Sequence, residues 1–176
     1  MLHTETLFCK AILKFLAGGK FVGFLLFREC WKNYKKFEEK LNDKNYYDLD
    51  TVCRIKFGLG LFNIIFASFP KALSALIRII GFQPGNKEKG LEYLESCINS
   101  AAKSRSALAA IVLCLYHIDL NPNLEKVCEI LKKYMRLYPK NALFQWIASN
   151  VSWKYSQLDD AVFFIKNSLK SCPESF

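Results

Sequence analysis

The chain has 176 residues, of which 52% are hydrophobic and 15% aromatic, and its formal net charge is +9. This composition excludes a disordered chain and supplies enough apolar side chains for the core of one domain. The seven cysteines are odd in number, are scattered without a CxxC pair and mostly have apolar neighbours, which favours a reducing compartment over a disulfide framework.

The first fifty residues predict a helical hairpin followed by a polar loop. Apolar residues recur at helical spacing over residues 7–17, and Gly18-Gly19 ends this run. A longer helix is expected at residues 20–41, and the polar residues 42–50 are expected to form a loop.

A very apolar stretch follows at residues 54–80. One interpretation is a membrane span, which needs about 20 uninterrupted apolar residues. Because Pro70 and Lys71 interrupt the stretch, two short buried helices at residues 55–68 and 71–80 are the favoured interpretation.

The rest of the chain predicts further helices joined by short connections, which favours antiparallel neighbours. We expect Asn86 and Asn121 to cap two of them, since an Asn side chain accepts from the free N–H groups of a first turn. The helices are expected at residues 87–102, from 104, from 121, at 141–155 and at 158–171. On the last helix the residues expected to face inward are Leu158, Ala161, Val162, Ile165 and Leu169.

A repeat is visible in this second half. Pro139 and Pro173 each close a helical run and lie 34 positions apart. Small or apolar residues precede the two prolines at matching offsets: Val127 and Leu131, then Ala161 and Ile165. Thirty-four residues is the period of the tetratricopeptide repeat, a stacking helix-turn-helix unit. The sequence therefore predicts an all-α fold, with antiparallel helical hairpins stacked as a tetratricopeptide-like α-solenoid. Residues 1–50 would form the N-terminal hairpin and polar loop, and residues 51–176 the repeat region of one continuous domain.

The helix at residues 141–155 carries a candidate protein-binding groove. Trp146, Asn150, Trp153 and Lys154 fall on one face of it. An Asn amide can bond a peptide backbone, and Trp supplies a large contact area. The alternative is that both tryptophans pack against a neighbouring repeat.

The second candidate is a basic surface on the helix at residues 20–41. Its members are Arg28, Lys32, Lys35, Lys36 and Lys40. Such a stripe can meet anionic lipid or RNA through charge. Interleaved glutamates favour a solvated helix face instead, and we expect no nucleic-acid partner.

No combination of residues indicates catalysis. His3 and His117 are the only histidines, and their places in a terminal segment and at a helix end favour surface or helix-end histidines over a general base or metal ligand. Gly58 and Gly60 lack the third glycine and the strand of a dinucleotide loop, so they indicate close helix packing. We expect no enzymatic activity, no cofactor, no metal and no small-molecule substrate.

Several segments, in this order and spacing, resemble a known family. They are Gly18-Gly19, residues 58–63 (GLGLFN) followed by Pro70, Gly81-Phe82, and Tyr138-Pro139-Lys140. Over nearly its whole length the chain resembles the tetratricopeptide repeat protein 39 and inclusion body clearance family. Because members of that family are longer, it resembles a shortened or partial member.

The resemblance implies a non-enzymatic scaffold in the cytoplasm that binds a protein partner near organelle membranes. Family roles suggest a link to lipid homeostasis or to the clearance of protein inclusions. The alternative is a peripheral membrane or lipid-droplet-associated factor that uses the apolar residues 57–80 and the basic surface on an anionic membrane.

Overall fold

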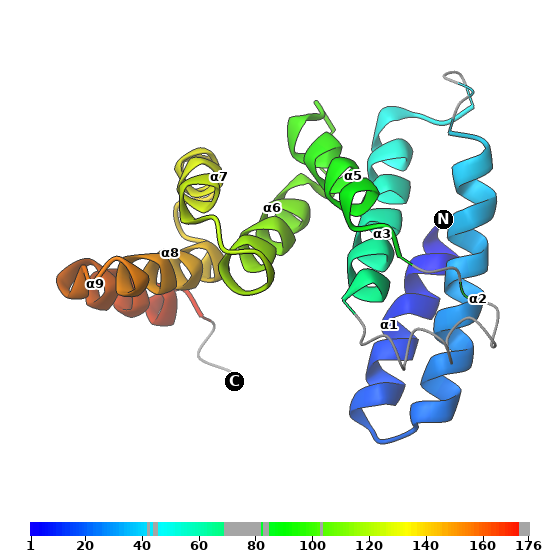
Figure 1. The fold of residues 1–176 in the computed structure, drawn as a ribbon, viewed down its shortest axis with the longest axis horizontal. Coiled ribbons are helices and arrows are strands. Elements are labelled where there is room, and N and C mark those ends of the chain that lie inside the picture. The colour runs from blue at the N-terminus through cyan, green and yellow to red at the C-terminus, as the bar shows by residue number, and fades with distance from the viewer. Residues whose placement is uncertain (42, 44–45, 69–81, 83–84, 103, 173–176) are drawn as a thin grey trace. The chain divides into compact units, whose positions relative to one another are not determined.

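The computed structural model describes residues 1–172 except 42, 44–45, 69–81, 83–84 and 103 (Figure 1). The helix expected at residues 71–80, together with Pro70 and Pro173, lies outside the described residues. The chain divides into two compact units, Met1–Ser106 and Ala107–Phe176. The boundary expected at residue 50 does not coincide with this division, and the single continuous domain stays a prediction.

The first unit begins with an antiparallel hairpin of α1 (Leu2–Leu16) and α2 (Lys20–Glu39) (Figure 1). Gly18 turns the chain with a φ of +81°, a conformation that glycine adopts without strain. The N–H of Gly19 then donates to the carbonyl of Lys14 at 2.9 Å and closes the end of α1.

Helix α3 (Leu49–Ala67) crosses α5 (Lys87–Asn99) at close range. A Cβ added to Gly60 would lie 3.0 Å from the carbonyl oxygen of Gly90, and one added to Gly90 would lie 3.0 Å from the carbonyl oxygen of Gly60. The backbones can approach this closely only because neither residue has a side chain. The expected role in helix packing fits both glycines: Gly60 lies at this crossing, and Gly58 packs against the ring of Tyr34 on α2.

The core of the first unit is built around Phe62, which is fully buried on α3. Five aromatic rings surround it at centroid distances between 4.7 and 5.7 Å, those of Phe8, Phe27, Trp31, Tyr34 and Phe66. The partners come from α1, α2 and α3, so this one ring joins the hairpin to α3.

Asn63 connects α3 to the start of α5. Its side chain donates to the carbonyl of Leu59 and accepts from the backbone N–H of Asn86 at 3.0 Å. Asn86 in turn accepts from the N–H of Lys89, so the N-cap predicted at Asn86 is confirmed.

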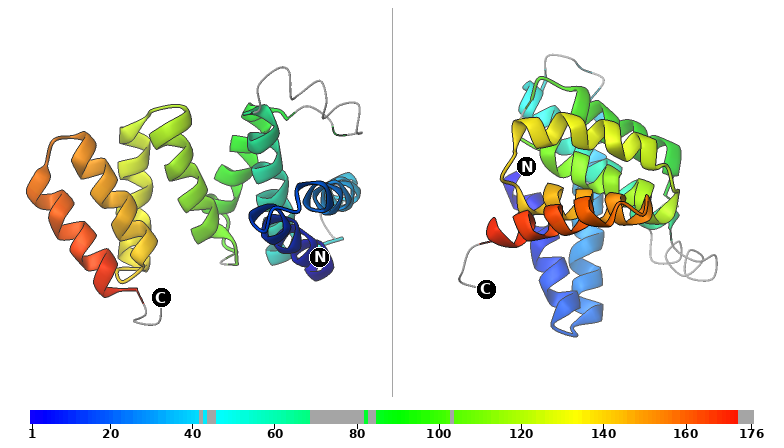
Figure 2. Two further views of the ribbon diagram at one scale, coloured as in Figure 1. Left: turned by 90° about the horizontal axis from the view of Figure 1, so that it is seen from below. Right: turned by 90° about the vertical axis from the view of Figure 1, so that its left-hand side faces the viewer.

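The second unit continues with helices joined by short turns (Figure 2). They are α6 (Ser106–Leu115), the π-helix η1 (Tyr116–Leu120), α7 (Leu124–Leu137), α8 (Ala142–Lys154) and α9 (Leu158–Lys170). Asn123, not the expected Asn121, caps α7 by accepting from the N–H of Lys126, because Asn121 instead ends η1, where its N–H donates to the carbonyl of Tyr116.

Two serine hydroxyls hold α8 against α9. Ser149 donates to the carbonyl of Ala161, and Ser168 donates to the carbonyl of Ala142, both at 2.9 Å. The residue numbers of the bonded positions increase along α8 while they decrease along α9, so the two helices are antiparallel. The prediction of an all-α, tetratricopeptide-like helical solenoid is thus confirmed.

The matched positions of the repeat lie inside the second unit. Val127 on α7 and Ala161 on α9 are both buried, as the 34-residue spacing predicted. The inward face expected for α9 was wrong at Leu158, Val162 and Leu169, which are 48–67% exposed, whereas Ile165 is half-buried.

Candidate functional site

Helix α8 carries the four residues predicted to bind protein. Trp146 is 42% exposed and Trp153 is 68% exposed, so both indole rings reach solvent. Lys154 is exposed beside them, and Asn150 is half-buried and donates to the carbonyl of Trp146 at 2.9 Å. The four residues share one side of the helix, as the spacing predicted. Their role in binding stays a prediction.

The other side of α8 is buried against the rest of the unit. Its buried members are Phe144, Gln145, Ile147, Ala148, Val151 and Ser152. Two residues along an α-helix correspond to about 200° of rotation, so Trp146 points away from Ala148. Packing of both tryptophans against a neighbouring repeat stays the alternative interpretation of this face, and more than half of the Trp146 surface is already covered.

Helix α9 also exposes apolar side chains, on the side opposite to its contact with the α7–α8 groove. Phe164 faces a groove that it shares with α7 and α8, and Val162 lies about 200° away around α9. Val162 is 48% exposed, and Leu158 and Leu169 follow the same side at 57% and 67%. We call Trp146, Trp153, Leu158, Val162 and Leu169 the outer apolar face of the α8–α9 hairpin.

The groove on the opposite side has a volume of about 730 Å³. Leu131 and Met135 of α7 line it, with Val151 of α8 and Phe164 of α9. None of the four predicted groove residues lines it. This groove was not predicted from the sequence, although the apolar stripes of α7 and α8 that line it were both visible there.

The basic surface on α2 is partly committed to other contacts. Lys35 pairs with Glu38 at 2.7 Å and lies 4.9 Å from the ring centre of Trp31. Lys40 donates to the hydroxyl of Tyr46 at 2.6 Å, and this bond raises the pKa of Lys40. Lys32 and Lys36 are exposed, and Arg28 is half-buried. Binding of this surface to lipid or RNA stays a prediction.

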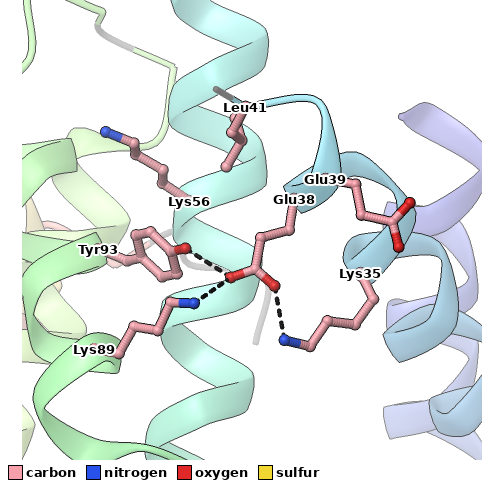
Figure 3. Close-up of a pocket in the computed structure, with 7 residues that line it drawn as sticks. All are labelled: Lys35, Glu38, Glu39, Leu41, Lys56, Lys89 and Tyr93. Carbon is pink, nitrogen blue, oxygen red and sulfur yellow. Dashed lines mark hydrogen bonds and ion pairs between the residues drawn. The ribbon is translucent and has the colours of Figure 1, made fainter. Parts of the chain in front are cut away.

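Glu38 is the centre of an ion-pair cluster (Figure 3). Its carboxylate lies 2.7 Å from Lys35 Nζ and 2.8 Å from Lys89 Nζ, and it accepts from the hydroxyl of Tyr93 at 2.7 Å. Burial alone would raise the pKa of Glu38, but the bonds from Lys35, Lys89 and Tyr93 outweigh it and lower the pKa to about 2. The carboxylate therefore stays ionised and ties α2 to α5.

The same cluster borders a polar cavity of about 680 Å³. Lys56 also lines it and donates to the hydroxyl of Ser96 at 2.8 Å. Burial and the bond to Glu38 raise the pKa of Tyr93 to about 12, so its hydroxyl stays a donor. The ammonium groups here are held by intramolecular partners, which indicates a structural joint between helices.

The apolar stretch at residues 57–80 was the predicted membrane contact. Its described part belongs to α3, where Leu59, Phe62 and Phe66 are at most 5% exposed. These side chains fill the core of the first unit and cannot meet lipid while it is folded. Of the helices in the described part of the chain, none combines the length and the apolarity needed to cross a membrane.

Comparison with known proteins connects this architecture to a family. The family model described as Iml2/Tetratricopeptide repeat protein 39 matches residues 3–175. The chain belongs to this family. No solved structure matches the chain.

Membership of the Iml2/Tetratricopeptide repeat protein 39 family bears out the resemblance seen in the sequence. A tetratricopeptide-like member is a helical-repeat protein of a kind that generally serves protein interaction and generally lacks catalysis. The exposed outer apolar face of α8–α9 is a surface suited to that task.

Proposed function

We propose that this member of the Iml2/Tetratricopeptide repeat protein 39 family is a non-enzymatic cytoplasmic adaptor. It binds a protein partner through the outer apolar face of the α8–α9 hairpin, with Asn150 and Lys154 at the edge of the contact. The first unit is a separate helical unit, held together by the Phe62 core and the Glu38 cluster.

The exposure of two tryptophans on one helix face is the observation that carries this proposal. Trp146 and Trp153 lie two turns apart on α8 with 42% and 68% of their surface in solvent. Tryptophan dominates the energetically important positions of protein interfaces, where each one often contributes about 2 kcal/mol or more. Contiguous exposed apolar surface on a folded protein commonly marks an interaction site.

Affinity capture with matched variants tests the proposal. The full chain, a Trp146→Ser/Trp153→Ser double variant and a Leu120→Ser/Leu137→Ser control are used as baits in cell extract. Leu120 and Leu137 are 55% and 60% exposed and lie outside the outer apolar face. We expect proteins retained by the wild type and the control to fall about thirtyfold or more with the tryptophan variant. Equal retention by all three folded baits would rule the face out.

The more specific suggestion, a role in lipid homeostasis or inclusion clearance, rests on the resemblance to the family. This specific role stays a prediction. The partner found by capture would test it, because a partner from neither process would remove its support.

A further inference from the structure

The end of the α1–α2 hairpin is apolar and open to solvent. We call residues 12–22 the hairpin tip. Six large apolar side chains in it are 38–80% exposed: Ile12, Leu13, Phe15, Leu16, Phe21 and Val22. Helix α1 is last fully buried at Ala11, and the core of the unit packs on residues nearer the other end of the hairpin, such as Leu7 and Cys30.

The charged residues around the hairpin tip are all basic. The sequence contains no Asp or Glu between Glu5 and Glu29. Lys10 and Lys14 are exposed on α1 just before and within the tip. Apolar side chains flanked by lysines match the surface of an anionic bilayer, where lysine meets the headgroups and apolar side chains enter the acyl boundary.

The side-chain chemistry favours lipid over protein. Protein interfaces are enriched in aromatic residues, Met and Arg and depleted in Lys, whereas the tip has two Phe, no Tyr, Trp, Met or Arg, and exposed Lys10 and Lys14 beside it and in it. Its apolar members are Leu, Ile, Val and Phe, the residues that partition most readily into hydrocarbon.

The backbone of the tip suits the interface between water and lipid. The N–H groups of Ala17, Gly18 and Gly19 donate to the carbonyls of Leu13, Phe15 and Lys14 at 2.9–3.1 Å. These three donors are satisfied by α1, whereas α2 begins after Gly19 without a side-chain cap, so the first N–H groups of α2 suit the headgroup region and not the hydrocarbon.

The dimensions indicate shallow insertion. From Ala11 to Leu16 the helix rises by about 8 Å at 1.5 Å per residue. Interfacial protein segments typically bury about 5–10 Å into the boundary between headgroups and acyl chains. We propose that the hairpin tip inserts to this depth into an anionic lipid membrane, a contact that is distinct from the protein-binding face of α8–α9.

Vesicle flotation tests the proposal with the full chain. Vesicles of phosphatidylcholine alone and of phosphatidylcholine with phosphatidylserine are compared at low and high salt. The tip variant is Leu16→Asp/Phe21→Asp, at side chains that are 80% and 75% exposed. The control is Leu49→Asp/Leu137→Asp, at side chains that are 55% and 60% exposed, which changes the net charge equally. Circular dichroism confirms that each variant is folded.

We expect the wild type and the control to float with phosphatidylserine vesicles, and the tip variant to lose about tenfold or more of its partitioning. Lys10→Gln/Lys14→Gln should lower binding to these vesicles about fivefold per lysine and leave binding to phosphatidylcholine unchanged. Failure of the wild type to float, or equal flotation of a folded tip variant, would overturn the proposal. Wild-type self-association that the tip variant abolishes, without flotation, would assign the tip to a protein interface and overturn it equally.

Discussion

At Glu38 a single carboxylate holds donors from two helices. Lys35 precedes it by one turn on α2, whereas Lys89 and Tyr93 come from α5. Tyr93 is 55 positions away in the chain, so no local pattern could predict the contact. In the sequence Glu38 was only one of the glutamates that diluted the basic surface. The fold gives it a structural role.

Replacing Glu38 by Gln should destabilise the first unit by about 1–2 kcal/mol at neutral pH, since two ammonium groups lose their partner. The lowered pKa makes this contribution pH-dependent. It is fully present above the ordinary value of 4.5 and is lost as the pH falls towards about 2. Urea unfolding across that range should therefore show the two proteins converging in acid.

The neighbouring substitution Glu39→Gln provides the control, because Glu39 is exposed. It should change the free energy of unfolding by less than about 0.5 kcal/mol. Identical stability of wild type and Glu38→Gln at neutral pH would show that the cluster contributes nothing.

Phe62 is the residue on which the core of the first unit depends most. Its fully buried ring touches five other aromatic rings, so Phe62→Ala should cost about 3–5 kcal/mol through lost burial and a remaining cavity. Chemical denaturation measures this loss. Phe21→Ala, at a side chain that is 75% exposed, should cost less than about 0.5 kcal/mol. A similar loss for both would contradict the packing described.

Among the elements, the crossing of α3 and α5 depends on the absence of two side chains. Valine at Gly90 would bring its Cβ to 2.9 Å from Ile64 Cγ1 and 3.0 Å from the Gly60 carbonyl oxygen, which forces the helices apart. We expect Gly90→Val to lower the free energy of unfolding by about 1–3 kcal/mol.

The same measurement on Gly60→Val and on the double variant sharpens this prediction. Because both substitutions disrupt the same contact between α3 and α5, the double variant should lose less free energy of unfolding than the two single variants lose in sum. Additive losses, or no loss in either single variant, would show that the backbones do not approach as described.

Periodicity placed most helices within a few residues, since Gly, Pro and capping Asn mark their ends. It could not orient α9, which carries apolar residues on most of its circumference. Ser168 decides the orientation: it is 7% exposed and donates to the carbonyl of Ala142. A buried serine looks like a surface residue in a sequence, and for that reason Leu158, Val162 and Leu169 were placed inward.

The face shared by Trp146, Asn150, Trp153 and Lys154 followed from the helical period alone. Whether it is covered depends on neighbouring helices, and that depends on packing between distant segments. The hairpin tip was likewise expected as part of a helical hairpin, but its exposure became visible only once the core was known to lie nearer Leu7 and Cys30.

For the whole molecule, the expectation of one continuous domain has a thermodynamic consequence. If the units Met1–Ser106 and Ala107–Phe176 unfold together, calorimetry should give one transition whose van't Hoff and calorimetric enthalpies agree. Phe62→Ala should then lower the midpoint of that single transition. Two resolved transitions, with only one of them shifted, would show independently folding units.

We have proposed that the chain binds a protein partner through the outer apolar face of α8–α9. Photo-crosslinking measures this most directly, with a benzoylphenylalanine placed at Trp153 in one bait and at Leu137 in another. Both side chains are more than half exposed, at 68% and 60%. We expect a discrete crosslinked partner from position 153 and none from position 137. The same products from both positions, or none from position 153, would contradict it.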